Sequence, residues 1–325
     1  EPTPEYFTLS FIGDCTLAPH QNTQDYFNKV GDDYAYPFAN TVQYFADDEY
    51  TFANLECTFS DRSLSPVGYP TFYFRAPTSY VNILLEGGVD FVTTANNHLN
   101  DFGDKGVEDT YATLDNAGLP YGKVGQAQVV TTKNGIKIGV YCGFNINDGY
   151  FVPTTDECVN AINQMKADGA EYIVMAFHWG KELYYKPTQK MIDLAQACID
   201  AGADLIYGTH PHVLGPIVEY NGGIIMYSVG NWSFGGNTQP TDQDTAIIQV
   251  TIKRDVDGSI TTEGYDAIPC CVSSNMSGGV GYNDYKPTPY PEDNEGYKRV
   301  LSKLDMNSGW ENANKDYSAW YSAWG

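Results

Sequence analysis

The fold is decided by the stretch EYIVMAFHWGKELYYKPTQKMIDLAQACIDAGADLIYG, residues 171–208. It begins with EYIVMAFH (171–178), an apolar run of the length and composition of a buried strand. TQKMIDLAQACIDAG (188–202) then repeats apolar residues at helical spacing, and ADLIYG (203–208) is a second short apolar run. A strand, a helix and a strand in succession predict a layered α/β domain.

The same alternation extends toward the amino terminus. We predict strands at 6–13, 50–56, 89–95 and 136–144, and helices at 78–88, 106–118 and 156–169. After residue 208 the pattern changes, and strand-like runs with short turns follow one another at 213–220, 222–230, 244–254 and 259–269. Successive strands without helices predict antiparallel pairing and a mixed second sheet.

The two ends of the chain differ from this pattern. Residues 1–5, with Pro2 and Pro4, are interpreted as the remnant of a linker behind a cleaved signal or lipid-anchored segment. After about residue 271 the composition shifts to Gly, Tyr, Asp and Pro, with one predicted helix at 295–305. We interpret 271–325 as an appendage packed on the core, and leave open whether its aromatic end, SAWYSAWG, covers a pocket.

Composition excludes some classes of protein. The chain has 18 basic and 41 acidic residues, a net charge of −23, and no basic patch for a nucleic-acid backbone. A polyanionic substrate would be repelled at long range unless a bound cation reversed the local charge. No stretch approaches the roughly 20 apolar residues of a membrane-spanning helix. The seven cysteines form no CxxC motif, so most are expected to be buried apolar residues rather than a disulfide scaffold.

Potential metal ligands gather at the predicted carboxyl ends of strands. His98, His178 and the pair His210 and His212 all stand there, whereas His20 lies in a loop. Two carboxylates end strands in the same way: Asp14 in FIGDCTL and Glu56 in FANLECTF. Such strand ends form the crevice where α/β sheets bind ligands. Each residue alone has a structural explanation, as a loop or helix cap or a hydrogen-bonded turn residue.

The motif HPH at 210–212 is more specific. Pro211 fixes its own φ and favours an extended His210, and residues two apart in an extended segment face the same way. We therefore expect both imidazoles to point toward one place. A set of carboxylates, histidines and an asparagine suits Zn, Mn or Fe. One or two such ions would support hydrolysis of a phosphoester or an amide, or stabilise an enolate formed next to a carbonyl.

At this point a family resemblance is visible. In order, the chain resembles the motifs of the CapA/PgsA family of bacterial capsule (poly-γ-glutamate) synthesis proteins over roughly residues 6–270: GDCTL (13–17), NLECTFS (54–60), FRAP (74–77), ANNHLNDFG (95–103), HWGKE (178–182), GTHPHV (208–213) and YSVGNWSF (227–234). That family looks like a branch of the calcineurin-like metallophosphatases. The resemblance implies a four-layer αββα sandwich with mixed sheets and a two-metal site.

The resemblance also implies roles for single residues. Asp14 and His212 would bind the first metal, Glu56 would take the place of a bridging aspartate, and Asn97, His178 and His210 would bind the second metal. His98 would be the acid or proton shuttle. The chain departs from the metallophosphatase pattern at Thr16, where a histidine is usual, so the first site is expected to bind weakly or stay empty.

The remaining polar residues of these motifs have alternative roles. Arg75 is either a clamp for a substrate carboxylate or phosphate or part of a structural ion pair. Glu182 would act as a general base or support a ligand, Asp101 would orient His98, and Asn231 would face the pocket. Cys15 and Cys57, each following a proposed ligand, are either a redox-sensitive pair or simply small residues below the site.

Three functions are consistent with this site. The first is a metal-dependent hydrolase of an amide or phosphoester at the extracellular face of the membrane. The second is a non-catalytic assembly or export factor for an anionic, poly-γ-glutamate-like polymer, associated with a membrane-bound capsule synthesis complex. The third is an epimerase that removes an α-proton. His98 and Asp101 favour the first, because simple binding does not require an acid pair.

Overall fold

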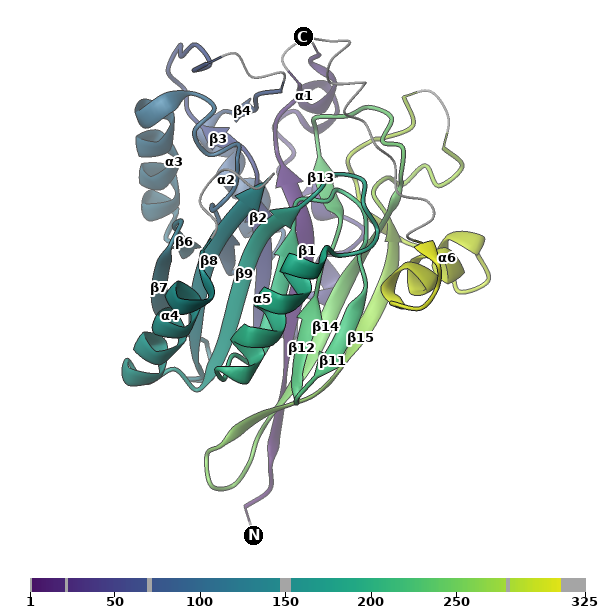
Figure 1. Ribbon diagram of the computed structural model, residues 1–325. Helices are drawn as coiled ribbons and strands as arrows, with labels where there is room; N and C mark the ends of the chain where they lie inside the picture. Colours follow the sequence, from purple (N-terminus) through teal and green to yellow (C-terminus); the bar gives the residue numbers. More distant parts are fainter. Residues whose placement is uncertain (1, 21–22, 69–71, 147–152, 279–280, 311–325) are drawn as a thin grey trace.

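Two β-sheets face each other in the computed structural model (Figure 1), which describes residues 2–20, 23–68, 72–146, 153–278 and 281–310. The first sheet has eight strands in the order β16-β15-β14-β1-β2-β5-β6, with β13 pairing β1 beside this path. Its strands are β1 (Glu5–Thr16), β2 (Tyr50–Leu55), β5 (Phe91–Thr93), β6 (Tyr121–Gly122), β13 (Asn231–Phe234), β14 (Asp244–Arg254), β15 (Ile260–Cys271) and β16 (Thr288–Pro289). Strands β1, β2, β5 and β6 are parallel, whereas β14, β15 and β16 add antiparallel partners.

The second sheet has six strands in the order β11-β12-β10-β9-β8-β7. They are β7 (Gln126–Thr131), β8 (Lys137–Ile146), β9 (Tyr172–Gly180), β10 (Leu205–Thr209), β11 (Ile217–Tyr220) and β12 (Gly223–Met226). The four central strands are parallel and the two edge strands are antiparallel to their neighbours. A short two-stranded sheet pairs β3 (Thr58–Phe59) with β4 (Arg75–Ala76).

Apolar side chains fill the space between the sheets and cover both outer faces. Leu9, Phe11 and Phe52 of the first sheet pack in one cluster with Val174 and Tyr207 of the second. The helices α4 (Thr155–Ala167) and α5 (Gln189–Asp200) cover the outer face of the second sheet, in front of β8 and β9 in Figure 1. The opposite outer face is covered by α1 (Asp25–Val30), α2 (Val81–Glu86) and α3 (Gly103–Ala117). The layers are thus helix, sheet, sheet and helix, which confirms the predicted αββα sandwich.

The predicted antiparallel pairing and the mixed second sheet are confirmed, but two of the strands expected there belong to the first sheet. The runs at 213–220 and 222–230 do contribute a hairpin, β11 and β12, to the second sheet. The runs at 244–254 and 259–269 instead form β14 and β15 of the first sheet, because β14 pairs along β1 from Glu5 to Phe11. The pairing partner lies more than 200 residues away in the chain, so local pattern does not reveal which sheet receives the strand.

The carboxyl-terminal part described by the structure packs against this sheet. Strand β16 pairs with β15, and α6 (Glu295–Leu304) lies over β14 and β15. Buried charges fasten the helix: the Lys303 Nζ donates to Asp242 at 2.7 and 2.6 Å and to Asp244 at 2.6 Å. Arg299 donates twice to Asp244, at 2.6 Å each time. The sequence SAWYSAWG lies outside the described residues.

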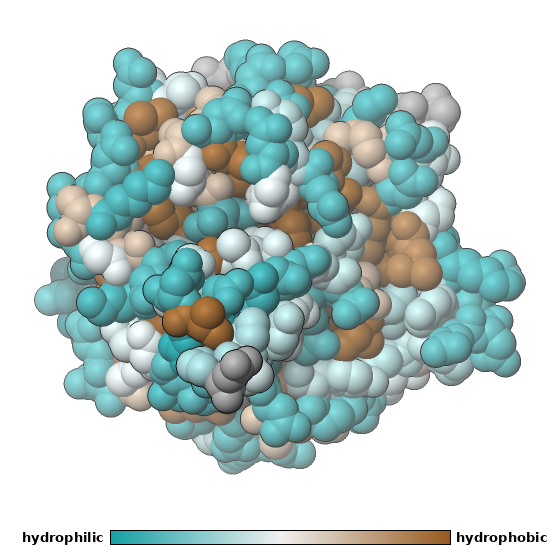
Figure 2. Space-filling model, turned by 90° about the horizontal axis from the view of Figure 1, so that it is seen from below, coloured by the Kyte–Doolittle hydropathy of each residue, from teal (hydrophilic) through white to brown (hydrophobic). Residues whose placement is uncertain are grey.

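The face seen from below carries mainly hydrophilic and intermediate residues, with small brown hydrophobic areas between them (Figure 2). The strands β1, β8 and β9 point away from this face, toward the top of Figure 1. Among the described residues, the structure contains no helix that combines the length and apolar character needed to cross a membrane.

Candidate metal centre

Polar side chains from both sheets meet where the central parallel strands end. Asp14 lies near the end of β1 and Glu56 directly follows β2, both in the first sheet. His178 lies in β9 of the second sheet, and His210 directly follows β10. Because these strands run in the same direction, their carboxyl ends lie at one end of the sandwich, at the top of Figure 1.

Gly13 allows two segments of the chain to approach each other closely here. A Cβ at Gly13 would lie only 2.0 Å from the carbonyl oxygen of Gly230. The amide of Asp14 donates to this same oxygen at 3.0 Å, so β1 is held tightly against the segment that leads into β13. The register of β1 against β2 shifts between Phe11 and Asp14, next to this contact. The irregular strand end therefore has a local cause in the sequence FIGDC.

The two carboxylates are fully buried but differ in their partners. Asp14 Oδ1 accepts a hydrogen bond from Asn54 at 2.8 Å, and Asp14 Oδ2 lies 3.2 Å from His212 Nδ1. Glu56 Oε1 lies 3.5 Å from His178 Nε2 and 3.8 Å from His212 Nε2. Neither oxygen of Glu56 has a hydrogen-bond partner among the described residues. A buried carboxylate without such partners is costly, and a cation is the partner that best removes this cost.

Three groups of residues bring potential ligand atoms within 4.8 Å of one another. They are Glu56 with His178 and His210, Asp14 with Glu56 and His212, and Glu182 with His210 and His212. The first two groups share Glu56. Oxygen and nitrogen ligands without thiolate suit a borderline or hard divalent ion. The donor set and the unsatisfied Glu56 carboxylate therefore fit a divalent metal site.

The HPH turn has a different backbone from the one predicted. His210 has φ of +96° and His212 has φ of +56°, so the segment is not extended. Positive φ is unfavourable for both histidines, and tertiary contacts oppose the local preference set by Pro211. The Pro211 carbonyl accepts a hydrogen bond from the Leu183 amide at 2.8 Å, and the His210 amide donates to Asp14 at 3.4 Å. The two rings still lie close, with centroids 5.7 Å apart.

Burial and charge divide the histidines into two kinds. Burial, followed by the neighbouring imidazoles, lowers the pKa of His178 and of His210 well below the usual range. Burial also acts to lower the pKa of His212, but the carboxylates of Glu56 and Asp14 outweigh it and raise this pKa to about 10. Burial, followed by the charge of Asp14, raises the pKa of Glu56. His178 and His210 are thus neutral near pH 7, the form in which imidazole binds metals.

His98 lies beside the cluster and has a carboxylate partner of its own. Its Nδ1 lies 2.9 Å from Asp101 Oδ2, which also accepts the Phe74 amide at 2.8 Å. The Phe74 ring contacts the imidazole edge to face, with centroids 4.7 Å apart. The preceding residue, Asn97, places its Oδ1 2.8 Å from His178 Nε2. His98 is therefore held in one orientation, next to a residue that contacts the cluster.

Arg75 contacts the loop that follows β3. Its Nη1 donates to the backbone carbonyls of Arg62 at 2.7 Å and Leu64 at 3.2 Å, and the guanidinium lies over the Phe102 ring at 5.2 Å. These contacts hold the loop after β3.

Asn231 and Glu182 both lie at the cluster. Asn231 Oδ1 is 2.9 Å from His212 Nδ1, and its Nδ2 donates to the His212 carbonyl at 3.4 Å. Asn231 therefore orients the histidine rather than pointing into open space. Glu182 follows β9 and brings its carboxylate within 4.8 Å of ligand atoms of His210 and His212.

Sequence reasoning missed Asn54, which connects the two sheets. Its Nδ2 donates to Asp14 at 2.8 Å and lies 3.2 Å from His178 Nδ1. Its Oδ1 accepts from Asn96 at 3.1 Å, and Asn96 also donates to the Leu55 carbonyl at 2.8 Å. A signal was present, because Asn54 is an amide inside the otherwise apolar strand YTFANL.

Thr16 and the neighbouring cysteines have structural roles. The Thr16 hydroxyl donates to the backbone carbonyl of Glu56 at 3.2 Å and so connects β1 to the residue after β2. Cys15 and Cys57 are buried and free, as are the other cysteines. Burial, above all other causes, raises the pKa of the Cys57 thiol to about 12, which keeps it protonated and unreactive.

Comparison with known proteins adds a family and a fold. The model of the family described as bacterial capsule synthesis protein PGA_cap matches residues 8–235. The capsule biosynthesis protein CapA of Bacillus anthracis is 29% identical over 271 residues, which cover 77% of this chain and 64% of that protein, less than two thirds of its length. The PGA biosynthesis protein CapA of Bacillus subtilis (strain 168) is 25% identical over 333 residues, with coverage of 94% and 80%.

Among solved structures, a novel phosphatase from Mycoplasma pneumoniae is similar with a TM-score of 0.50. The alignment covers 82% of this chain and 93% of that one, at 15% sequence identity. At this identity the likeness concerns the fold, which agrees with the helix-sheet-sheet-helix layers described above.

Proposed function

The chain belongs to the bacterial capsule synthesis protein family PGA_cap, and we propose that it is a metal-dependent hydrolase that cleaves an amide or phosphoester bond in capsule or poly-γ-glutamate metabolism. The observation that carries this proposal is the 2.9 Å contact between His98 and Asp101 beside the ligand cluster. A site that only binds a polymer has no need for a histidine held by a carboxylate, whereas a hydrolase needs an acid for its leaving group.

The cluster would hold one or two divalent ions, Zn, Mn or Fe. Asp14, Glu56 and His212 would hold one, and Glu56, His178 and His210, with Asn97, the other. An ion in this place would polarise the bond to be cleaved and lower the pKa of a nearby water. The Thr16 hydroxyl donates to the Glu56 carbonyl. Because Thr16 stands where the metallophosphatase pattern has a histidine, the first group has one ligand fewer, and we expect it to bind its ion more weakly.

The chain's own residues would move the proton. Asp101 accepts the hydrogen on Nδ1 of His98, which fixes the tautomer and leaves Nε2 as the atom that gives or takes a proton. The Phe74 amide donates to the same Asp101 oxygen and prevents the carboxylate from turning away. The Phe74 ring packs on the imidazole and limits its rotation. Together these contacts hold the acid in a constant position relative to the cluster.

Our proposal for the substrate and the place of action is supported by the family rather than by the geometry of the site. We propose an anionic polymer or peptide of the poly-γ-glutamate type, handled at the extracellular face of the membrane together with a capsule synthesis complex. With a net charge of −23, the chain needs a cation in the site to offset the repulsion of such a polymer.

The test begins with metal analysis of protein purified without chelator. A screen of phosphoesters and γ-glutamyl peptides follows, comparing the wild type with His98→Ala, His210→Ala and Asn97→Ala. Glu86→Ala is the control, because Glu86 lies exposed at the end of α2. We expect bound metal, and turnover that each of the first three variants loses and the control keeps.

Two results would contradict hydrolysis in favour of the other functions. Polymer binding that survives His98→Ala, with no turnover of any substrate by the wild type, would identify an assembly or export factor. Solvent deuterium incorporated at a substrate α-carbon, without cleavage, would identify an epimerase.

A further inference from the structure

We propose that Glu182 is a metal ligand, which binds a divalent cation together with His210 and His212 at the partly exposed side of the site. This inference rests on the proposed function only in so far as both require a cation in the cluster. It gives Glu182 a role different from that of a general base. Because His210 and His212 also belong to the two groups described above, an ion bound with Glu182 takes the place of one of the two ions proposed there.

The position of the carboxylate is the first reason. Glu182 has an oxygen within 4.8 Å of a ring nitrogen of each histidine, and those nitrogens are equally close to each other. Ligand atoms about 2.0–2.2 Å from a tetrahedral zinc ion lie roughly 3.3–3.6 Å apart, so side-chain rotations that bring the three atoms closer by about 1 Å or more complete the geometry. Two imidazoles and one carboxylate form a common set of protein ligands for a zinc ion with an open position.

The backbone around Glu182 is the second reason. The next residue, Leu183, donates its amide to the carbonyl of Pro211 at 2.8 Å, and Pro211 is the residue between the two histidines. Leu183 has φ of +63°, a conformation that costs a residue with a branched side chain about 1 kcal/mol or more. The loop after β9 and the HPH turn are thus held together by a hydrogen bond that requires strained backbone. Strain of this kind persists where the surrounding structure holds a side chain in place.

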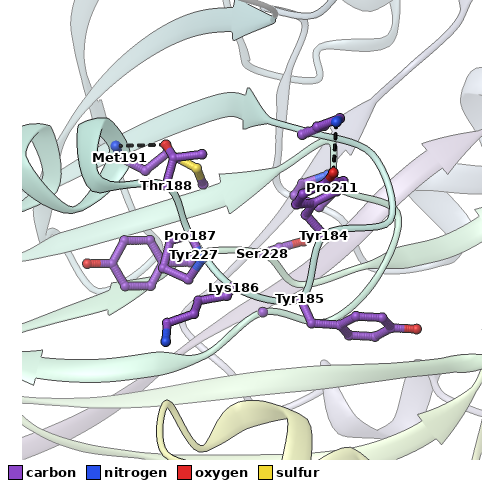
Figure 3. Close-up of a pocket in the computed structure, with 11 residues that line it drawn as sticks. Tyr184, Tyr185, Lys186, Pro187, Thr188, Met191, Pro211, Tyr227 and Ser228 are labelled. Carbon is purple, nitrogen blue, oxygen red and sulfur yellow. Dashed lines mark hydrogen bonds between the residues drawn. The ribbon is translucent and has the colours of Figure 1, made fainter. Parts of the chain in front are cut away.

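The neighbouring loop supports the same position. Tyr184 and Tyr185 line a small pocket beside the HPH turn, together with Pro211 and Ser228 (Figure 3). The Lys181 Nζ donates to the Tyr184 hydroxyl at 2.8 Å and lies over its ring. The residues on both sides of Glu182 are therefore packed, which limits the positions available to its carboxylate.

Burial distinguishes Glu182 from the other glutamate of the cluster. Glu56 is fully buried between the sheets, whereas Glu182 is partly exposed. The Thr16 hydroxyl at the end of β1 is already bonded to the Glu56 carbonyl. Glu182 therefore offers the HPH turn an oxygen ligand on the more exposed side of the cluster.

The experiment measures binding of Co²⁺ to metal-free protein by equilibrium dialysis and by the visible absorption of the bound ion. Glu182→Gln keeps the size of the side chain and removes its charge, and Glu182→Asp keeps the charge but shortens the reach. Glu86→Gln is the matched control, because Glu86 lies exposed at the end of α2. Thermal unfolding of each metal-free variant shows whether it is folded.

We expect Glu182→Gln to bind Co²⁺ roughly 10-fold or more weakly than the wild type, with a changed absorption spectrum. Glu182→Asp should retain part of the affinity, and Glu86→Gln should match the wild type. Unchanged affinity, stoichiometry and spectrum in Glu182→Gln would overturn the proposal. If that variant also loses turnover, Glu182 is a base and the hydrolase proposal stands. A wild type that binds no Co²⁺ would overturn both proposals.

Discussion

Replacing Lys303 by methionine should loosen the attachment of α6 to the first sheet. Lys303 is 2% exposed, and methionine preserves most of its apolar stem while removing the charge. Asp244 keeps Arg299, whose two hydrogen bonds to it are 2.6 Å long. Asp242 loses its cation and keeps the Tyr185 hydroxyl, a neutral donor at 2.8 Å. Removing one partner of a buried pair costs about 3–5 kcal/mol, and because one of the two carboxylates remains paired we expect about 3 kcal/mol.

The assay is urea denaturation followed by tryptophan fluorescence, to which Trp310 contributes because it lies 4.9 Å from the Lys303 ammonium. Lys298→Met is the matched control in the same helix, since Lys298 pairs with Glu295 at 2.9 Å while both side chains are largely exposed. We expect this control to leave the free energy of unfolding nearly unchanged. Equal free energies of unfolding for the two variants would refute the inference that buried charges hold the helix in place.

Three further predictions concern the strands and the site. Gly13→Ala should lower the stability by roughly 3 kcal/mol, seen as a lower melting temperature, because the new Cβ would lie 2.0 Å from the Gly230 oxygen. Burial raises the pKa of Asp204 to about 6, above its unfolded value of about 3.9, so its contribution to stability is present below pH 4 and lost as the pH rises through 6. Asp204→Asn should therefore gain on the order of 3 kcal/mol over the wild type between pH 4 and pH 7 in urea titrations, and a constant difference would contradict this. Asn54→Ala should weaken Co²⁺ binding by about 10- to 100-fold, because Asp14 and His178 lose their common partner, and unchanged binding would show that the amide is dispensable.

Sequence patterns predicted an α/β domain and the strand ends at which the polar residues gather, whereas the four layers were implied by the family resemblance. The pattern-based predictions depend on apolar periodicity, which is a local property of the sequence. The patterns failed where contacts between residues far apart in the sequence determine the local backbone conformation. The extended HPH segment was wrong because hydrogen bonds from Leu183 and to Asp14 select positive φ at His210 against the preference imposed by Pro211. The sequence also does not reveal that Arg75 donates to two backbone carbonyls, and its role as an anion clamp stays a prediction.

The cluster takes its side chains from both halves of the sandwich, with Asp14 and Glu56 in one sheet and His178 and His210 in the other. An ion held by members of both would act as a reversible cross-link across the main apolar interface. Each tenfold rise in the concentration of free ion above its dissociation constant would then add about 1.4 kcal/mol to the free energy of unfolding. The melting temperature would then depend on the concentration of free ion. The same chain would unfold at a higher temperature in a metal-rich medium than in a depleted one.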